Sequence, residues 1–178
     1  MKHNWLYISD SDMHLRYVLG ESGKNPLICI GLNPSTAIPD YLDSTLERVR
    51  AIAENHKCDS WIMLNIYPYR GSDPKMLPDN SIDDRYINQN INEIEKILKK
   101  YPKSQVLCAW GDNITQKRYI AEVFRDKLLK VLIKHENRLK CLKLTKKDHP
   151  CHPSRFSTSS EFIKFKISEY TKLKIFQK

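Results

Sequence analysis

The stretch Pro26-Leu27-Ile28-Cys29-Ile30-Gly31-Leu32-Asn33-Pro34-Ser35 decides the fold of this chain. Its first five residues form an apolar run, which is typical of a buried strand, and Gly31 then permits a tight turn. The turn brings Asn33 to the carboxyl end of the strand, which is where open α/β sheets bind their ligands. We therefore expect an α/β fold with a binding pocket at this edge of the sheet.

A second segment, His152-Pro153-Ser154-Arg155-Phe156-Ser157, is expected to form the other side of that pocket. It has neither helical nor strand periodicity, so His152 is predicted to lie on a loop rather than in the core. An exposed loop histidine without a functional role is the alternative interpretation.

Strand-like and helix-like patterns alternate along the chain, which predicts an α/β protein. A short N-terminal β-hairpin is expected within 4–20, from Trp5–Ser9 and Tyr17–Leu19, and the core is expected over 26–172. Strands are predicted over 26–30, 60–66, 106–110 and 139–144, and helices over 44–55, 83–100, 120–131 and 160–172. We expect a single domain over 1–178, built as a three-layer α/β/α sandwich around a central, mainly parallel four-stranded sheet.

Local signals set the bounds of two helices and one loop. The spacing of Ser44 and Glu47 is that of a capping box, so Ser44 is expected to cap the helix over 44–55. Pro102 is expected to end the helix over 83–100. The segment 67–81 is rich in Pro, Gly, Asp and Ser and too long for an ordinary connection, which indicates a functional surface loop.

The composition predicts a cytoplasmic protein with a substantial hydrophobic core. The chain has 178 residues, 40% of them hydrophobic, and no apolar run approaches a membrane span. Residues 1–10 lack the basic, apolar and small-residue order of a signal peptide. We expect a monomer that does not engage membranes. Reduced thiols are expected at the five cysteines, which are odd in number: Cys29, Cys58, Cys108, Cys141 and Cys151.

The net charge of +9 makes polyanions plausible partners. The basic excess is concentrated over 134–147, which carries only Glu136 as an acidic residue and leads into the His152 segment. Nucleic acid is the partner that this placement suggests, whereas a merely solvating lysine-rich surface is the alternative. The basic residues of the stretch are Lys134, Arg138, Lys140, Lys143, Lys146 and Lys147.

No metal or other cofactor is expected. His149, Cys151 and His152 lie close together in sequence, but a second pair of ligands with zinc-site spacing is missing elsewhere.

Four motifs resemble the marks of the uracil-DNA glycosylase superfamily, in the same order along the chain. They are Gly31–Ser35, Leu64-Asn65, Ala109-Trp110-Gly111 and His152–Ser157. The chain also resembles a bacterial domain-of-unknown-function family numbered 1643, a name that carries no activity. This second resemblance rests on Gly31–Ala37, Ser44–Arg48, Asn65, Tyr69-Arg70 and Asp73-Pro74.

The superfamily resemblance implies a pocket that cleaves the N-glycosidic bond of a base in DNA. His152 would donate a hydrogen bond to a base carbonyl oxygen as negative charge develops there, and Asn33 would position the attacking water. Asn65 would pair with the Watson–Crick edge of the base. Tyr41 is expected to stack on the base, with Tyr67 or Tyr69 as alternatives. Further substrate-binding residues are expected at Gly31, Leu32, Pro34 and Ser35, whereas Trp110 and Gly111 are interpreted as structural.

The same resemblance implies that the base leaves the duplex to reach the pocket. Phe156 would enter the vacated base stack and Ser154 would hold a backbone phosphate, with a further phosphate contact from Arg155. Ser157, Lys146 and Lys147 complete the expected DNA-binding set. Some glycosylase branches carry a four-cysteine iron–sulfur cluster, which the cysteine spacing here does not fit.

Two departures from the superfamily pattern argue against a strict uracil enzyme. Asn33 stands where the uracil-specific branch has aspartate, and Ser35 stands where it has a tyrosine that blocks 5-substituted pyrimidines. We therefore expect a uracil-like, mismatched or modified pyrimidine as the substrate. The alternatives are a non-catalytic nucleic-acid or nucleotide binder and a nucleoside or nucleotide N-glycosidase.

Overall fold

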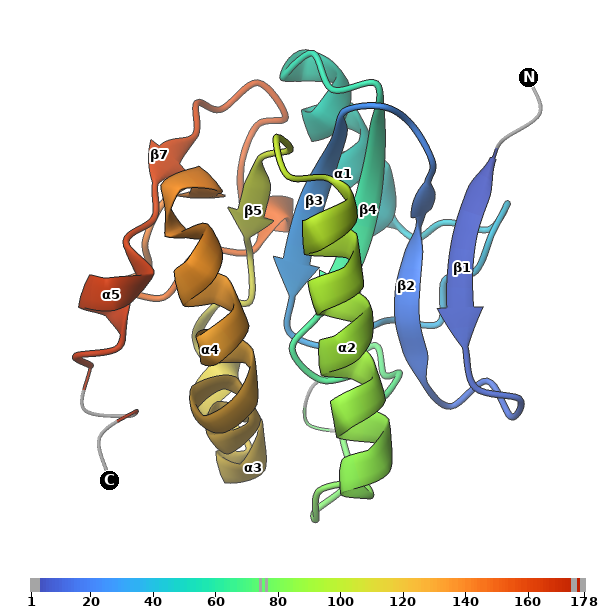
Figure 1. The fold of residues 1–178 in the computed structure, drawn as a ribbon, viewed down its shortest axis with the longest axis vertical. Coiled ribbons are helices and arrows are strands. Elements are labelled where there is room, and N and C mark those ends of the chain that lie inside the picture. The colour runs from blue at the N-terminus through green and yellow to red at the C-terminus, as the bar shows by residue number, and fades with distance from the viewer. Residues whose placement is uncertain (1–3, 74, 76, 174–175, 177–178) are drawn as a thin grey trace.

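The chain forms a seven-stranded mixed β-sheet with helices on both faces (Figure 1). The computed structural model describes residues 4–73, 75, 77–173 and 176. Pro74 of the Asp73-Pro74 motif lies outside the described residues. The strands are β1 Trp5–Ser9, β2 Arg16–Glu21, β3 Pro26–Gly31, β4 Ser60–Asn65, β5 Val106–Cys108, β6 Leu139–Cys141 and β7 Ile163–Lys164. The helices are α1 Ser44–Asn55, α2 Asp84–Lys100, α3 Arg118–Val123, α4 Leu129–Leu132 and α5 Ile167–Tyr170.

The strand order is β1-β2-β4-β3-β5-β6-β7, and β4, β3, β5 and β6 are parallel. This confirms the predicted parallel core, but the sheet has seven strands where a four-stranded sheet was expected. The N-terminal hairpin is also confirmed, and it extends the sheet because β2 pairs antiparallel with β4. In the central pair, Gly31 lies opposite Asn65, so both strands end at the same edge of the sheet.

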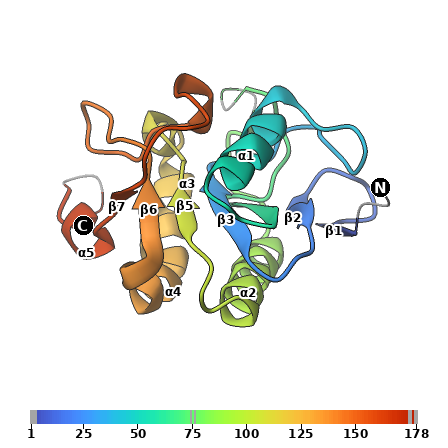
Figure 2. The same ribbon diagram turned by 90° about the horizontal axis from the view of Figure 1, so that it is seen from above.

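Each face of the sheet has its own hydrophobic core. Ile28 and Ile30 pack on the side covered by α2, α3 and α4, whereas Leu27 and Cys29 pack on the side covered by α1. Figure 2 shows α1 on one side of the sheet and α2 and α4 on the other. The sheet is therefore the middle of three layers, as fully buried parallel strands require.

The predicted helix over 44–55 is confirmed, but its predicted cap is wrong. Asp43 is the N-cap residue, and its Oδ1 accepts a hydrogen bond from the Leu46 N–H at 2.9 Å. Either Asp43 or Ser44 has the chemistry of a cap. The helix begins at Ser44 itself, so the preceding residue takes the capping position.

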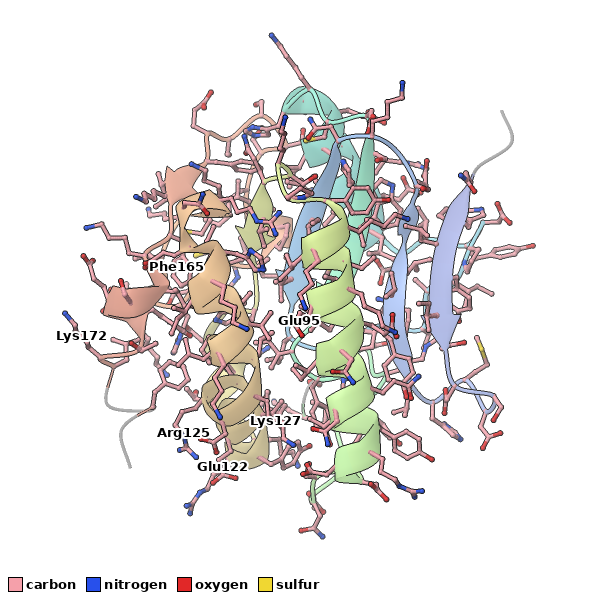
Figure 3. All side chains as sticks on the ribbon, viewed as in Figure 1. Glu95, Glu122, Arg125, Lys127, Phe165 and Lys172 are labelled. Carbon is pink, nitrogen blue, oxygen red and sulfur yellow. The ribbon has the colours of Figure 1, made fainter. Side chains whose placement is uncertain are left out.

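The helix predicted over 83–100 is present as α2, which Asp83 caps and which ends two residues before Pro102. The apolar stripe predicted over 120–131 is buried, on a helical run in which a π-helical turn, Phe124–Leu128, joins α3 to α4. This helical run lies beside α2, and Lys127 points from it in Figure 3. Surface ion pairs link the two, such as Lys127–Asp84 with an Nζ–Oδ2 distance of 3.0 Å.

The helix predicted over 160–172 is largely wrong. Ile163 and Lys164 form β7, antiparallel to β6, and only Ile167–Tyr170 is α-helical. The Phe165 N–H donates to the Leu139 oxygen at 3.0 Å, and the Phe165 ring packs edge-on against Trp110. Pairing with the exposed edge of β6 thus overrides the local helical pattern.

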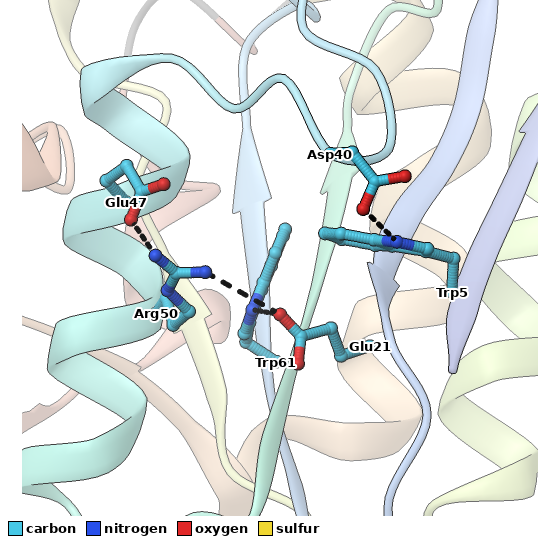
Figure 4. Close-up of polar contacts among 6 residues, drawn as sticks. All are labelled: Trp5, Glu21, Asp40, Glu47, Arg50 and Trp61. Carbon is cyan, nitrogen blue, oxygen red and sulfur yellow. Dashed lines mark hydrogen bonds and ion pairs between the residues drawn. The ribbon is translucent and has the colours of Figure 1, made fainter. Parts of the chain in front are cut away.

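Polar contacts attach the hairpin to α1 and to the loop before it (Figure 4). The Trp5 indole donates to Asp40 Oδ1 at 3.1 Å, and the Trp61 indole donates to Glu21 Oε1 at the same distance. The Glu21 carboxylate also lies 4.0 Å from Arg50 on α1. These contacts hold the segment between β3 and α1, which lines the cavity described below.

All five cysteines are free thiols, and Cys29, Cys108 and Cys141 are buried within strands. In the part of the chain that the structure describes, no helix combines the length and apolar character needed to cross a membrane.

Candidate functional site

A cavity of about 530 Å³ opens at the carboxyl ends of the parallel strands. Its walls come from the turn after β3, the start of α1, the loop after β4, the segment after β5 and the His152 segment. Asn33 and His152 both line it, so the two segments that the sequence suggested as sides of a pocket lie at one cavity. Ligands up to the size of a nucleotide fit cavities of this volume.

Three backbone carbonyl groups fix the carboxamide of Asn33. Its Nδ2 donates to the oxygens of Gly71 at 2.9 Å, Pro34 at 3.3 Å and Tyr69 at 3.5 Å. These hydrogen bonds hold the amide nitrogen against the turn after β3 and the loop 67–81. The side-chain oxygen remains as a hydrogen-bond acceptor at the cavity wall, which suits a group that orients a water molecule.

The hydrogen bonds of His152 determine which ring nitrogen carries the proton. The Ser154 N–H points to Nδ1 at 3.3 Å, and the Ser154 hydroxyl lies 2.8 Å from the same atom. Because a backbone N–H can only donate, Nδ1 accepts, and neutral His152 carries its proton on Nε2. Burial lowers the pKa of His152, the charge of Arg155 lowers it further, and the charge of Asp43 opposes both effects. The ring is thus a neutral N–H donor on the cavity wall.

Asn65 lies behind the cavity wall instead of on it. Its side chain is 1% exposed and is not part of the lining. With its amide oriented to satisfy its neighbours, Nδ2 donates to the Asn33 main-chain oxygen at 3.2 Å. A Cβ atom on Gly31 would lie 3.0 Å from the side-chain amide group of Asn65, so glycine permits this close approach. Asn65 therefore supports the turn that carries Asn33, and the expected contact with a base edge is not available to it here.

None of the three tyrosines considered as stacking partners lines the cavity. Tyr41 is 76% exposed and lies on the loop before α1, whereas Tyr67 is buried and its hydroxyl accepts from the Ile82 N–H at 2.8 Å. Tyr69 is half-buried against the core. Leu32 and Ser35 do line the cavity, but Pro34 is buried behind it, where its oxygen accepts from the Gly71 N–H at 2.7 Å.

The expected DNA-binding residues divide into an exposed group and a packed one. Ser154 and Arg155 are exposed and line the cavity, and Lys146, Lys147 and Ser157 are exposed nearby in sequence. Phe156 is the exception. It packs against the core on the α1 side, and its oxygen accepts from Arg48 Nη1 at 2.7 Å. Because the Phe156 ring packs against this core, it does not project as a wedge in this structure.

Part of the basic stretch over 134–147 has a structural function. Arg138 is buried and donates to the oxygens of Leu98 at 2.7 Å and Tyr101 at 2.5 Å, where it satisfies carbonyl groups at the end of α2. Lys134 lies 3.8 Å from Glu95 on the surface of α2. The cationic surface beside the cavity is therefore smaller than the sequence suggested.

The segment after β5 gives the cavity a rigid wall. Trp110 is buried, and its indole donates to the Tyr170 hydroxyl at 2.9 Å, which agrees with a structural role. Gly111 has a φ of 66°, a left-handed conformation that favours glycine. His149 Nδ1 lies 2.7 Å from the same Tyr170 hydroxyl, and burial lowers the pKa of this histidine. Among the described residues, no three His, Cys, Asp or Glu side chains are placed to hold a metal ion.

Sequence reasoning missed Arg16, a buried cation on the cavity wall. Arg16 is 1% exposed, its Nη1 donates to the Ala37 oxygen at 2.9 Å, and its Nε has no partner among the described residues. Burial and the charge of Arg70 together lower its pKa to about 10, against the opposing effects of Asp43 and Tyr7. Arg16 is therefore still a cation at neutral pH. The sequence signal is an arginine at the start of an otherwise apolar strand.

The start of α1 was also missed as part of the cavity. Asp43, Ser44 and Thr45 all line it, and the Asp43 carboxylate lies where its charge raises the pKa values of both Arg16 and His152. Asp43 thus provides a carboxylate at the cavity, whereas the set of site residues predicted from the sequence included no acidic residue.

Comparison with known proteins gives a family without an activity. Neither a curated protein nor a solved structure matches the chain significantly. The model of one family, described as "Protein of unknown function (DUF1643)", matches residues 16–154. This match covers most of the chain and includes Arg16, Asn33, Asp43 and His152. The chain therefore belongs to the DUF1643 family.

Proposed function

We propose that this protein is a uracil-DNA-glycosylase-like enzyme that hydrolyses the N-glycosidic bond of a flipped uracil-like, mismatched or modified pyrimidine in DNA. The observation that carries the proposal is the pairing, on one cavity, of a neutral Nε2–H donor at His152 with a fixed amide oxygen at Asn33. The proposed reaction needs these two groups, one for the leaving base and one for the water.

In the proposed reaction the bond between C1′ and the base nitrogen breaks, and its electron pair leaves with the base. His152 donates a hydrogen bond to the base oxygen on which the negative charge develops. A water held by the Asn33 oxygen bonds to C1′ through its own oxygen and releases one proton, which passes through solvent to the departing base anion. The products are a free base and an abasic deoxyribose. The Asp43 carboxylate favours the positive charge that the sugar acquires on the way.

Space beside Ser35 supports a substrate broader than uracil. The Ser35 side chain is half-buried on the cavity wall, and its hydroxyl accepts from the Ala37 N–H at 3.3 Å. A large aromatic side chain at this position would fill space that serine leaves open. The proposed pocket therefore accepts substituents at the pyrimidine 5-position.

The test is a screen for abasic-site formation on oligonucleotides that each contain one altered or mismatched pyrimidine. His152→Ala is expected to lower the rate by about 10²–10³, the usual cost of losing one such donor. His14→Ala is the matched control, since His14 is exposed on the hairpin loop and should leave the rate unchanged. Wild-type protein that releases no base from any of these oligonucleotides would contradict the proposal.

A second candidate is N-glycosidic cleavage of free nucleotides, which the packing of Phe156 favours. With its ring against the α1-side core, Phe156 offers no wedge for opening a duplex, and a free nucleotide needs none. Under this alternative, Phe156→Ala leaves turnover of free nucleotides unchanged. Under the DNA proposal it lowers cleavage in duplex DNA more than in single strands.

A further inference from the structure

Arg16 is a buried cation that makes no ion pair among the described residues, although the more distant charge of Asp43 partly stabilises it. Its hydrogen bond goes to the neutral Ala37 oxygen, and no carboxylate of the described residues lies within ion-pair distance of its guanidinium. Burying a charge without an opposite charge is costly, so the energy must be recovered elsewhere. Since Arg16 lines the cavity, an anionic ligand bound there would offset this cost.

A second cation lies behind Arg16 and increases the positive potential. Arg70 donates to the oxygens of Ser35 at 3.1 Å, Thr36 at 2.6 Å and Ala37 at 2.9 Å. The Ala37 oxygen thus accepts from both arginines. Among the described residues, Arg70 likewise has no carboxylate within ion-pair distance.

The N-terminus of α1 faces the same cavity. This helix has 12 residues, and Ser44 and Thr45 at its start line the cavity. The next two backbone N–H groups are occupied, because Leu46 donates to the Asp43 carboxylate and Glu47 to the Asp43 main-chain oxygen. The N–H groups of Ser44 and Thr45 have no acceptor within the helix, and they carry the positive end of its dipole.

Negative charge at the cavity comes from Asp43 and Asp112. One oxygen of Asp43 is bound to the Leu46 N–H, and Asp112 Oδ1 accepts from the Thr145 hydroxyl at 2.5 Å. Both carboxylates are thus engaged in local hydrogen bonds. Arg16 and Arg155 on the lining equal these two carboxylates in number, so the positive end of the α1 dipole, with Arg70 outside the lining, favours an anion beside Arg16.

We propose that Arg16 and the N-terminus of α1 form an anion subsite inside the cavity, and that it takes the phosphate group of a nucleotide. A guanidinium and helix N–H groups are the donors that phosphate oxygens prefer. The choice of a nucleotide rests on the proposed function, whereas the anion subsite rests on the cavity alone. The phosphate is either a diester within a nucleic-acid strand or the monoester of a free nucleotide.

The first experiment titrates ¹⁵N-labelled wild-type protein with inorganic phosphate, thymidine, thymidine 5′-monophosphate and the dinucleotide TpT. Phosphate is expected to shift the Ser44 and Thr45 amide signals and the Arg16 Nε–H signal in a saturable way. The monophosphate should bind at least about tenfold more tightly than thymidine. Tighter binding of TpT than of the monophosphate identifies a strand phosphate, and the reverse identifies a monoester. Absence of saturable shifts with phosphate and both nucleotides would overturn the subsite.

The second experiment compares Arg16→Gln with Arg118→Gln. Glutamine keeps a donor for the Ala37 oxygen but removes the charge, so phosphate affinity should fall about tenfold. Arg118 is exposed on α3, away from the cavity lining, and its variant should bind phosphate as the wild type does. Equal affinities of the two variants would refute the assignment, and the wild-type titration decides the question if Arg16→Gln does not fold.

These measurements separate the subsite from the proposed reaction. Saturable phosphate binding without release of any base would contradict the glycosylase proposal and leave the subsite standing. Base release by a protein that does not bind phosphate at α1 would contradict the subsite alone.

Discussion

The surroundings of Asn33 determine what this residue can do. Its amide nitrogen donates to carbonyl oxygens of Pro34, Tyr69 and Gly71, so a carboxylate in its place would face acceptors only. The hydrogen bonds of the asparagine thus hold the turn and the loop together, and an aspartate at this position would not be equivalent.

Asn33→Asp is expected to destabilise the protein at neutral pH by about 1–3 kcal/mol, since a buried hydrogen bond is replaced by repulsion between acceptors. The same contacts should raise the pKa of the new carboxyl group. Stability should then recover as the pH falls and the group becomes protonated, because a protonated carboxyl group can donate to Gly71 again. Urea unfolding at several pH values, with wild-type protein beside it, measures this. A variant as stable as wild type at pH 7 would contradict the prediction.

His152 is expected to titrate below the ordinary histidine pKa of about 6.5. Burial disfavours the imidazolium ion, and Arg155 adds to this effect, whereas Asp43 opposes it. Protonation would also break the contact in which Nδ1 accepts from the Ser154 N–H. Activity should therefore be constant at neutral pH and fall as the pH drops below the lowered pKa.

A ¹H NMR titration of the imidazole signals checks the pKa of His152 without any substrate. Exposed His14 is the internal reference, since both rings are followed in the same sample. A midpoint for His152 at or above 6.5 would contradict the lowered pKa.

Among the elements, α1 links the stability of the fold to the site through its capping residue. Asp43→Ala removes the acceptor for the Leu46 N–H and should cost about 0.5–2 kcal/mol of folding stability, whereas Asp43→Asn retains a capping side chain and should cost little. Ser44→Ala is the matched control, because Ser44 lies inside the helix and does not cap it. Chemical denaturation of the three variants measures these differences. A larger loss for Ser44→Ala than for Asp43→Ala would restore the capping-box interpretation.

The elements that the sequence predicted well are those with a strong local pattern of buried residues. β3 and β4 are continuous apolar runs, and α2 has an apolar stripe with a cap at Asp83, so each has a strong local signal. The position of the α1 cap was missed by one residue, because Asp43 and Ser44 have similar capping chemistry. β7 was missed because its strand conformation depends on the edge of β6, a partner that is more than 20 residues away in sequence.

At the scale of the whole molecule, topology brings the site together, and the sequence revealed only the parts that follow strand ends. Asn33 was found because its motif follows an expected strand, and His152 was found because its motif lies on an expected loop. Arg16 was missed because its importance arises only when β2 joins the sheet next to β4 and places the start of the hairpin's second strand at the cavity. Asn65 was misplaced because the turn at Gly31 covers it, a close approach that only the folded register reveals.

The distribution of cations over the molecule gives a prediction about DNA binding. If Lys146, Lys147 and Arg155 contact phosphates beside the cavity, the logarithm of the binding constant should fall linearly with the logarithm of salt concentration. Each lysine removed should reduce the slope by about 1, so Lys146→Gln with Lys147→Gln should reduce it by about 2. Lys24→Gln with Lys103→Gln is the control of equal charge, since these exposed lysines precede β3 and β5 at the opposite end of the sheet. Fluorescence anisotropy with a labelled oligonucleotide at several salt concentrations measures both slopes. Equal slopes for the two double variants would mean that the net charge of +9, and not a surface beside the cavity, attracts DNA.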